Sequence, residues 1–236
     1  MATLNIQNDG TSTLSLAVPD DKQTDFLVRE IFTERCYLPA LPVHDARVIV
    51  DVGANVGLAA AYLRLSCPNA EIHCFEPAPA PLQYLQVNAQ RIGNCMVHPF
   101  GLHACDETAT MFLGREGTAT ASLFHHNYSS GERIAIPLRD AFSAFQEILQ
   151  GRDIDILKLD AEGCELPILT RARSFLEKAR LIYIEFHSEW DRRDMDDLLF
   201  GSHILWRAAI SSPLRGLLTY VLRSVLPERL PADALS

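Results

Sequence analysis

A turn that contains two glycines ends an apolar run of the sequence. Residues 47–52 read Arg-Val-Ile-Val-Asp-Val, and the turn follows at once, before a segment of small residues. This pattern predicts a buried strand that turns tightly into a helix, where unpaired backbone N–H groups and the missing glycine side chains let a polar ligand approach the chain. The residues expected near that ligand are Asp51, Gly53, Ala54, Asn55 and Gly57.

An acidic residue ends the next predicted strand, 71–75. This is Glu76, which Pro77 follows, and it lies 25 residues after Asp51. In a doubly wound sheet, an acid at this place accepts hydrogen bonds from both ribose hydroxyls of a nucleotide. The turn lacks the third glycine of the G-x-G-x-x-G pattern found in dinucleotide folds. The sequence therefore favours a nucleoside ligand without a pyrophosphate.

Further acids and a histidine follow the last two strands of the predicted sheet, at 154–159 and 181–186. These residues are Asp160, Glu162, Glu185 and His187. Because the carboxyl ends of parallel strands border one crevice, we expect all four beside the glycine turn. A carboxylate in a partly dry crevice can remove a proton from a nucleophile, and so can a histidine that a carboxylate orients. Spacing alone leaves open whether the four also bind a divalent metal ion.

Four motifs together resemble the FkbM family of S-adenosylmethionine-dependent methyltransferases. They are Val50-Asp51-Val52-Gly53-Ala54-Asn55-Val56-Gly57, Phe75-Glu76-Pro77, Ile156-Leu157-Lys158-Leu159-Asp160-Ala161-Glu162-Gly163-Cys164-Glu165 and Ile184-Glu185-Phe186-His187. The resemblance implies a Rossmann-like class I methyltransferase fold, S-adenosyl-L-methionine as the cofactor, and O-methylation of a hydroxyl on a small metabolite or sugar. It places the glycine turn at the methionine part of the cofactor and Asp160 at the acceptor or at the cofactor ammonium. Residues expected at the ribose and adenine are Glu76, Pro77, Phe100, Gly101 and Leu102.

Two other functions remain open. A subunit that binds the cofactor without acceptor chemistry would keep the same turn. A nicotinamide-dependent oxidoreductase is less favoured, because residues 53–57 do not provide an obvious set of pyrophosphate contacts.

Composition limits the classes of protein. The 236 residues, of which 48 % are hydrophobic, suffice for one sizeable core. A net charge of −9 argues against nucleic acid as the main partner, since binding phosphates needs a basic face. The six cysteines form no C-x-x-C pair and are interpreted as core residues in a reducing compartment. Without a run of 18 apolar residues, we expect a cytoplasmic protein with no integral membrane segment.

Periodicity divides the chain into three parts of one α/β domain. Residues 1–46 are predicted to form a β-hairpin and a helix that caps the sheet or the cofactor pocket. Residues 47–200 alternate strands and helices, which predicts a mainly parallel, doubly wound sheet with an inserted β-hairpin after the third strand at 96–100. The connection 114–132 includes His125 and His126 and is interpreted as an active-site flap or a mobile surface loop.

Residues 201–236 are predicted to form an amphipathic helical tail, because their leucines and valines recur at helical spacing. Such a tail would pack against the core or join a homo-oligomer. A lid over an apolar substrate and attachment to a membrane surface are alternatives.

Overall fold

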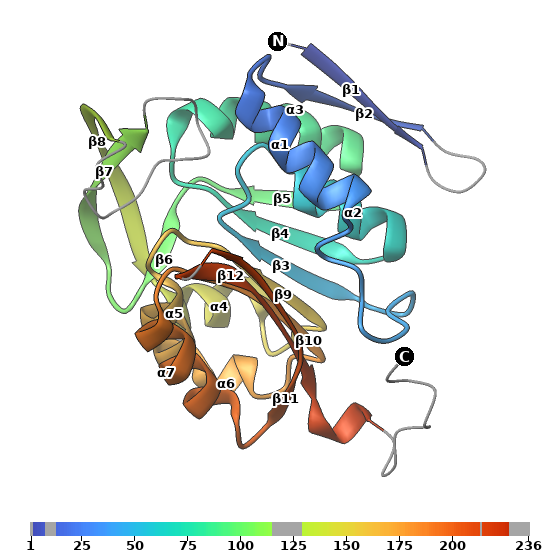
Figure 1. Ribbon diagram of the computed structural model, residues 1–236, viewed down its shortest axis with the longest axis vertical. Coiled ribbons are helices and arrows are strands. Elements are labelled where there is room, and N and C mark those ends of the chain that lie inside the picture. The colour runs from blue at the N-terminus through green and yellow to red at the C-terminus, as the bar shows by residue number, and fades with distance from the viewer. Residues whose placement is uncertain (1, 8–12, 115–128, 213, 227–236) are drawn as a thin grey trace.

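Seven strands form the central sheet, in the order β11-β12-β10-β9-β3-β4-β5 (Figure 1). The computed structural model describes residues 2–7, 13–114, 129–212 and 214–226. The parallel strands are β3 (Val48–Val52), β4 (Glu71–Phe75), β5 (Cys95–His98), β9 (Ile156–Leu159) and β10 (Leu181–Phe186). The hairpin of β11 (His203–Ser212) and β12 (Arg215–Leu222) completes one edge, with β12 antiparallel to β10. The predicted mainly parallel sheet is confirmed.

Helices cover both faces of this sheet (Figure 1). One face carries α1 (Lys22–Val28), its π-helical continuation η1 (Arg29–Thr33), α2 (Leu58–Ser66) and α3 (Pro79–Ile92). The other carries α4 (Ala141–Leu149), α5 (Glu165–Arg171), α6 (Arg173–Leu176) and α7 (Glu189–Leu199). Along β3, Ile49 belongs to the first of these two cores, and Val48 and Val50 belong to the second. Burial on both faces explains why the central strands are mostly apolar.

Two smaller sheets flank the central one. The predicted N-terminal hairpin is present as β1 (Ala2–Gln7) and β2 (Thr13–Val18), which pair antiparallel. The inserted hairpin is also present, as β7 (Glu107–Gly114) and β8 (Ser129–Asp140), and the short strand β6 (Gly101–His103) extends it to three strands. Most of the connection interpreted as a flap, with His125 and His126, lies outside the described residues.

The C-terminal segment corrects the sequence prediction. Its described residues do not form an amphipathic helix: β12 lies inside the sheet between β11 and β10, and the short 3₁₀ turn η3 (Arg223–Val225) follows within the described range. Leu217, Leu218 and Val221 recur at helical spacing, but residues 217–222 are nearly all apolar and include the strand formers Thr219 and Tyr220. The prediction was wrong because a strand that is buried on both faces does not alternate apolar and polar residues. Periodicity alone therefore cannot distinguish such a strand from a buried helix.

This correction removes the helical docking element that we expected for self-association. Within the described ranges, every helix is too short or too polar to cross a membrane.

Candidate active site

A cavity of about 600 Å³ lies at the carboxyl ends of the parallel strands. Most of the residues selected from the sequence line it, namely Gly53, Ala54, Asn55, Glu76, Pro77, Gly101, Leu102, Asp160, Glu162 and Glu185. The cavity is therefore the crevice that the strand ends predicted, and it lies where the strand order reverses, between β3 and β9. α1 and η1 also contribute to its wall, as the predicted capping helix would, through Gln23, Phe26, Leu27 and Glu30.

The glycine turn is held tightly against the neighbouring strands. Gly53 has φ +73°, and a Cβ atom there would lie 1.7 Å from the carbonyl oxygen of Asp160, so only glycine fits. The Gly53 and Ala54 N–H groups both donate to the Phe75 carbonyl at 3.0 Å. Gly57 adopts φ +89° at the start of α2, and its Cα faces Leu85 of α3. Gly57 therefore shapes the turn from behind, while Gly53, Ala54 and Asn55 border the cavity.

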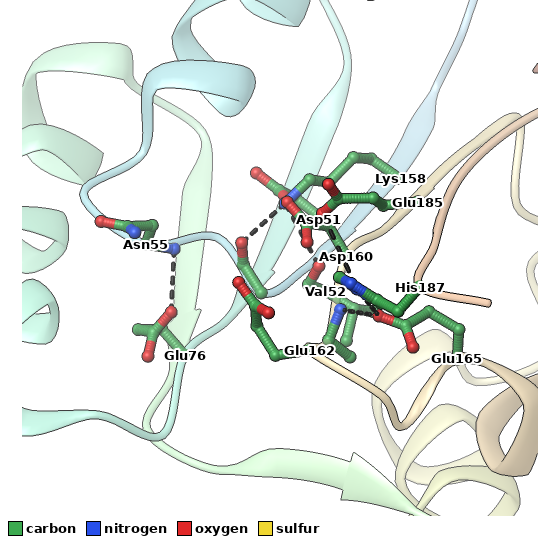
Figure 2. A network of polar contacts seen from close by, with 12 residues as sticks. Asp51, Val52, Asn55, Glu76, Lys158, Asp160, Glu162, Glu165, Glu185 and His187 are labelled. Carbon is green, nitrogen blue, oxygen red and sulfur yellow. Dashed lines mark hydrogen bonds and ion pairs between the residues drawn. The ribbon is translucent and has the colours of Figure 1, made fainter. Parts of the chain in front are cut away.

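Glu76 directly follows β4 and borders the cavity. One carboxylate oxygen accepts a hydrogen bond from the Asn55 N–H at 2.9 Å (Figure 2). The other accepts from the Ala78 N–H at 2.8 Å. Burial raises the pKa of Glu76 to about 7, although these two bonds oppose the shift. The side chain thus links the tip of β4 to the glycine turn, and each oxygen keeps a lone pair for a ligand.

A buried ion pair lies under the turn. Asp51 and Lys158 are opposite each other on the paired strands β3 and β9, with Oδ1 and Nζ 3.2 Å apart. Asp51 is fully buried and does not border the cavity, so the structure places it below the ligand space that we expected it to face. Burial raises its pKa, and Lys158 opposes that shift. Lys158 also lies 3.6 Å from Asp160 Oδ2, so it joins the turn to the acidic rim (Figure 2).

Three carboxylates form the acidic rim. Burial alone would raise the pKa of Asp160, but Lys158 and a hydrogen bond with Glu185 lower it to about 2. Burial and repulsion from Asp160 raise the pKa of Glu162 to about 7. The same two causes raise the pKa of Glu185 well above its usual range. Asp160 is therefore ionised at neutral pH, whereas Glu162 exchanges its proton there.

The turn after β9 places Glu162 of the acidic rim at the cavity. Glu162 has a left-handed conformation, with φ +50°, in the turn between β9 and α5. Glu165 holds this turn by accepting hydrogen bonds from the Ala161 N–H at 2.6 Å and the Gly163 N–H at 2.9 Å. A non-glycine residue held in this region at a ligand cavity is typical of a functional position.

His187 lies behind the rim. Its Nε2 atom is 3.5 Å from Glu165 Oε1 and 3.9 Å from Glu185 Oε2, and it is not among the described residues that border the cavity. Burial would lower its pKa, but the neighbouring carboxylates outweigh that effect and raise it. Ligand atoms of Asp160, Glu185 and His187 all lie within 4.8 Å of one another, as a metal site requires. Both carboxylates, however, already face a cationic side chain that would compete with a metal ion.

Arg215 and Glu30 belong to the site but were not predicted from the sequence. Arg215 of β12 contacts Glu185 at 2.5 Å and Glu162 at 3.7 Å. Glu30 of η1 borders the cavity, and burial and Asp160 raise its pKa. In the sequence, Arg215 is one basic residue of the segment that was predicted to be a helical tail. No local motif identifies Glu30 as a site residue.

Phe100 is not among the described residues that line the cavity. The third strand was predicted to end at residue 100, but β5 ends at His98. Phe100 packs with its ring centre 5.6 Å from that of Phe75, and the Arg139 guanidinium lies over it at 4.9 Å. Gly101 and Leu102 border the cavity at the expected place, while Phe100 is not among its described lining residues.

Comparisons with known proteins agree with this geometry. The family model of the methyltransferase FkbM domain matches residues 51–208. Among curated relatives, the 31-O-demethyl-FK506 methyltransferase FkbM of Streptomyces tacrolimicus is 40 % identical over 90 residues, which cover 38 % of this chain and 33 % of that one. Methyltransferase sdnD of Sordaria araneosa is 28 % identical over 181 residues, covering 62 % of this chain and 68 % of the relative. The match thus spans only a third of the length of the first relative.

A solved structure shares the fold. The fibrillarin pre-rRNA processing protein of Methanococcus jannaschii superposes with a TM-score of 0.53 at 11 % identity, covering 93 % of this chain and 88 % of that chain. At this identity the likeness concerns the fold alone. Together with the family match, it confirms the Rossmann-like methyltransferase fold predicted from the sequence.

Proposed function

The chain belongs to the FkbM methyltransferase family, and we propose that it transfers the methyl group of S-adenosyl-L-methionine to a hydroxyl group of a small metabolite or sugar. One observation carries the proposal: the glycine turn with Glu76 and the acidic rim of Asp160, Glu162 and Glu185 border the same cavity. A nucleoside that binds the first group has its reactive end beside the second.

The residues present fit this cofactor. The bare Cα of Gly53 leaves the turn close to the cavity, and Glu76 offers acceptor lone pairs where ribose hydroxyls would lie. Deeper in the site, Lys158 and Arg215 each contact two carboxylates of the set Asp51, Asp160, Glu162 and Glu185. Asp160 is ionised at neutral pH and borders the cavity, so it offers a negative charge to a ligand with a cationic sulfur and an ammonium group. When bound, the cofactor supplies a methyl group on that sulfur.

The rim supplies the acceptor chemistry. The acceptor hydroxyl must lose its proton during transfer, and a base works best when its pKa lies near the working pH. We assign this role to Glu162, which borders the cavity and has a pKa of about 7. Asp160, with a pKa of about 2, is too weak a base and instead accepts a hydrogen bond that orients the acceptor or the cofactor ammonium. His187 orients the rim from behind, through Glu165 and Glu185.

The size of the cavity and the net charge of the chain support a small acceptor. A cavity of about 600 Å³ that holds the cofactor as well leaves space for a small molecule or for one end of a larger one. The net charge of −9 disfavours nucleic acid as an acceptor.

Calorimetric titration tests the first step. We expect S-adenosylhomocysteine to bind the native chain and reduced nicotinamide dinucleotide not to bind, because the turn lacks the dinucleotide glycine pattern. A screen of hydroxylated metabolites with methyl-labelled S-adenosylmethionine then tests transfer, with denatured protein as the control. Absence of S-adenosylhomocysteine binding would overturn the proposal. Binding without transfer to any hydroxyl compound would favour a non-catalytic subunit.

A further inference from the structure

Lys158 is a buried cation for which the chemistry above has no direct use. It lies on β9, and its side chain is only 4 % exposed. Burial alone would lower its pKa, but Asp51 and Asp160 raise it, so the amine is charged. A buried ammonium group is costly unless its donors are used, and its contacts therefore show what it does.

The ammonium group contacts more than its ion-pair partner. Nζ donates to the Gly53 carbonyl oxygen at 2.6 Å, which is shorter than its 3.2 Å contact with Asp51. It also lies 3.3 Å from the Val52 carbonyl oxygen and 3.6 Å from Asp160 Oδ2 (Figure 2). A group that only neutralised Asp51 would not need the carbonyl oxygens of the turn. Lys158 therefore fixes the backbone of the glycine turn as well.

The turn and Asp160 are in contact through the backbone too. The Asp160 N–H donates to the Val52 carbonyl at 3.1 Å, and the Asp160 carbonyl lies where a Cβ of Gly53 would be. Lys158 adds the side-chain connection, because one ammonium group reaches both the Gly53 carbonyl and the Asp160 carboxylate. A shift of either element changes its distance from the other.

We infer that Lys158 is a positioning residue that sets the distance between the glycine turn, which binds the methyl donor, and the Asp160 carboxylate, which orients the acceptor. This inference rests on the proposed function for its effect on rate, since an error of about 1 Å in the reacting geometry can cost about a hundredfold. The effect on the backbone of the turn does not depend on that function.

The test separates positioning from the neutralisation of Asp51. Lys158→Met alone leaves Asp51 as an unpaired buried carboxylate and is expected to unfold easily. The double variant Asp51→Asn/Lys158→Met removes both charges and keeps the shape, so we expect it to fold. It is compared with Asp51→Asn alone, which keeps the ammonium group on the Gly53 carbonyl. Arg180→Met is the control, because it removes an ion pair with Asp155 at the amino ends of β9 and β10.

Two measurements are made on each protein. Hydrogen exchange followed by mass spectrometry is expected to be faster at residues 51–57 in the double variant than in Asp51→Asn. The kcat for methyl transfer at saturating substrates is expected to be lower by about tenfold to a hundredfold in the same comparison. Arg180→Met should leave both unchanged. Equal exchange and equal kcat in the double variant and Asp51→Asn would overturn the inference.

Two further cases are covered. If the double variant does not fold, Lys158→Arg keeps the charge but moves the donors, and a wild-type exchange rate and kcat in that variant would overturn the inference. If the native chain binds no S-adenosylhomocysteine, the proposed function fails. The exchange comparison in the ligand-free protein still decides whether Lys158 holds the turn.

Discussion

Two networks of charged residues lie at opposite ends of the same parallel strands. At the amino end, Asp155 precedes β9 and accepts hydrogen bonds from the Arg47 N–H at 2.8 Å and the Val48 N–H at 3.0 Å. Its other oxygen lies 3.3 Å from Arg180, which precedes β10 and also contacts Asp45. Each carboxylate oxygen of Asp155 therefore has an N–H partner within the protein.

At the carboxyl end the acids are buried and repel one another. Asp51, Asp160, Glu162 and Glu185 share two cations, Lys158 and Arg215. The incomplete compensation appears in the raised pKa values of Glu162 and Glu185, and burial is the first cause of both. Crowded, partly compensated acids are costly to a fold, and such groups occur where a ligand or a proton transfer requires them.

The two charge networks are expected to have different roles. The amino-end network joins strands and should matter for folding, whereas the carboxyl-end network borders the cavity and should matter for binding and turnover. Matched substitutions at the two ends test this division directly.

The largest effect is expected for Glu162→Gln, which removes the base. kcat should fall by about 10²- to 10⁴-fold. Since the base must be ionised, kcat/KM for the acceptor, measured at saturating S-adenosylmethionine so that Glu76 does not contribute, should rise with pH up to about 7 and then level off. This rise should be lost in the variant. Glu71→Gln, at the amino end of β4, is the control and should keep the native profile. A variant that retains the rise near pH 7 would assign the base to another group.

A second large effect is expected for Asp160→Asn. Loss of the ionised carboxylate should lower kcat by about 10²- to 10³-fold, with little change in the affinity for S-adenosylhomocysteine measured by calorimetry. Asp155→Asn, at the start of the same strand, should show the reverse. It loses the negative charge that strengthens two backbone hydrogen bonds and pairs with Arg180, so its free energy of unfolding should fall by about 1–2 kcal/mol while kcat is kept. If Asp160→Asn loses cofactor affinity and keeps its rate at saturation, Asp160 belongs to the cofactor site alone.

Glu76→Gln is expected to act on binding. A hydrogen bond to a charged acceptor is worth about 1.5–3 kcal/mol, so the Kd for S-adenosylhomocysteine should rise by about tenfold to a hundredfold, with kcat at saturation nearly unchanged. Because ribose hydroxyls donate to the ionised carboxylate, native affinity should also increase as pH rises through about 7, and this dependence should vanish in the variant. Calorimetry across that pH range measures both. Undiminished binding by Glu76→Gln would place the ribose elsewhere.

Much of this site could be predicted because its signals are local. The residues at the ends of β3, β4, β9 and β10 follow apolar runs directly, and parallel topology brings those ends to one edge. The glycine turn needs only its own residues to be recognised. The third strand was predicted to end at residue 100, but β5 ends two residues earlier, at His98. This difference matters for Phe100, whose ring packs against Phe75.

The rest depends on pairing that no local pattern shows. Arg215 reaches Glu185 because β12 pairs antiparallel with β10, with Gly216 opposite Phe186. A residue in a supposed helical tail could not be placed there. Glu30 depends similarly on how η1 packs over the strand ends, and periodicity does not determine that packing.

The smallest effect is expected for Arg180→Met, which tests the amino end by itself. The variant loses a partly buried ion pair with Asp155, worth about 1 kcal/mol or less of unfolding free energy, because Asp155 keeps its two backbone donors. Urea unfolding measures that change, and kcat should stay within about twofold of the native value, since the substitution lies at the far ends of the strands. A tenfold loss of kcat with an unchanged free energy of unfolding would show that the two ends are coupled through β9 and β10. The charge networks would then not divide into one for folding and one for chemistry.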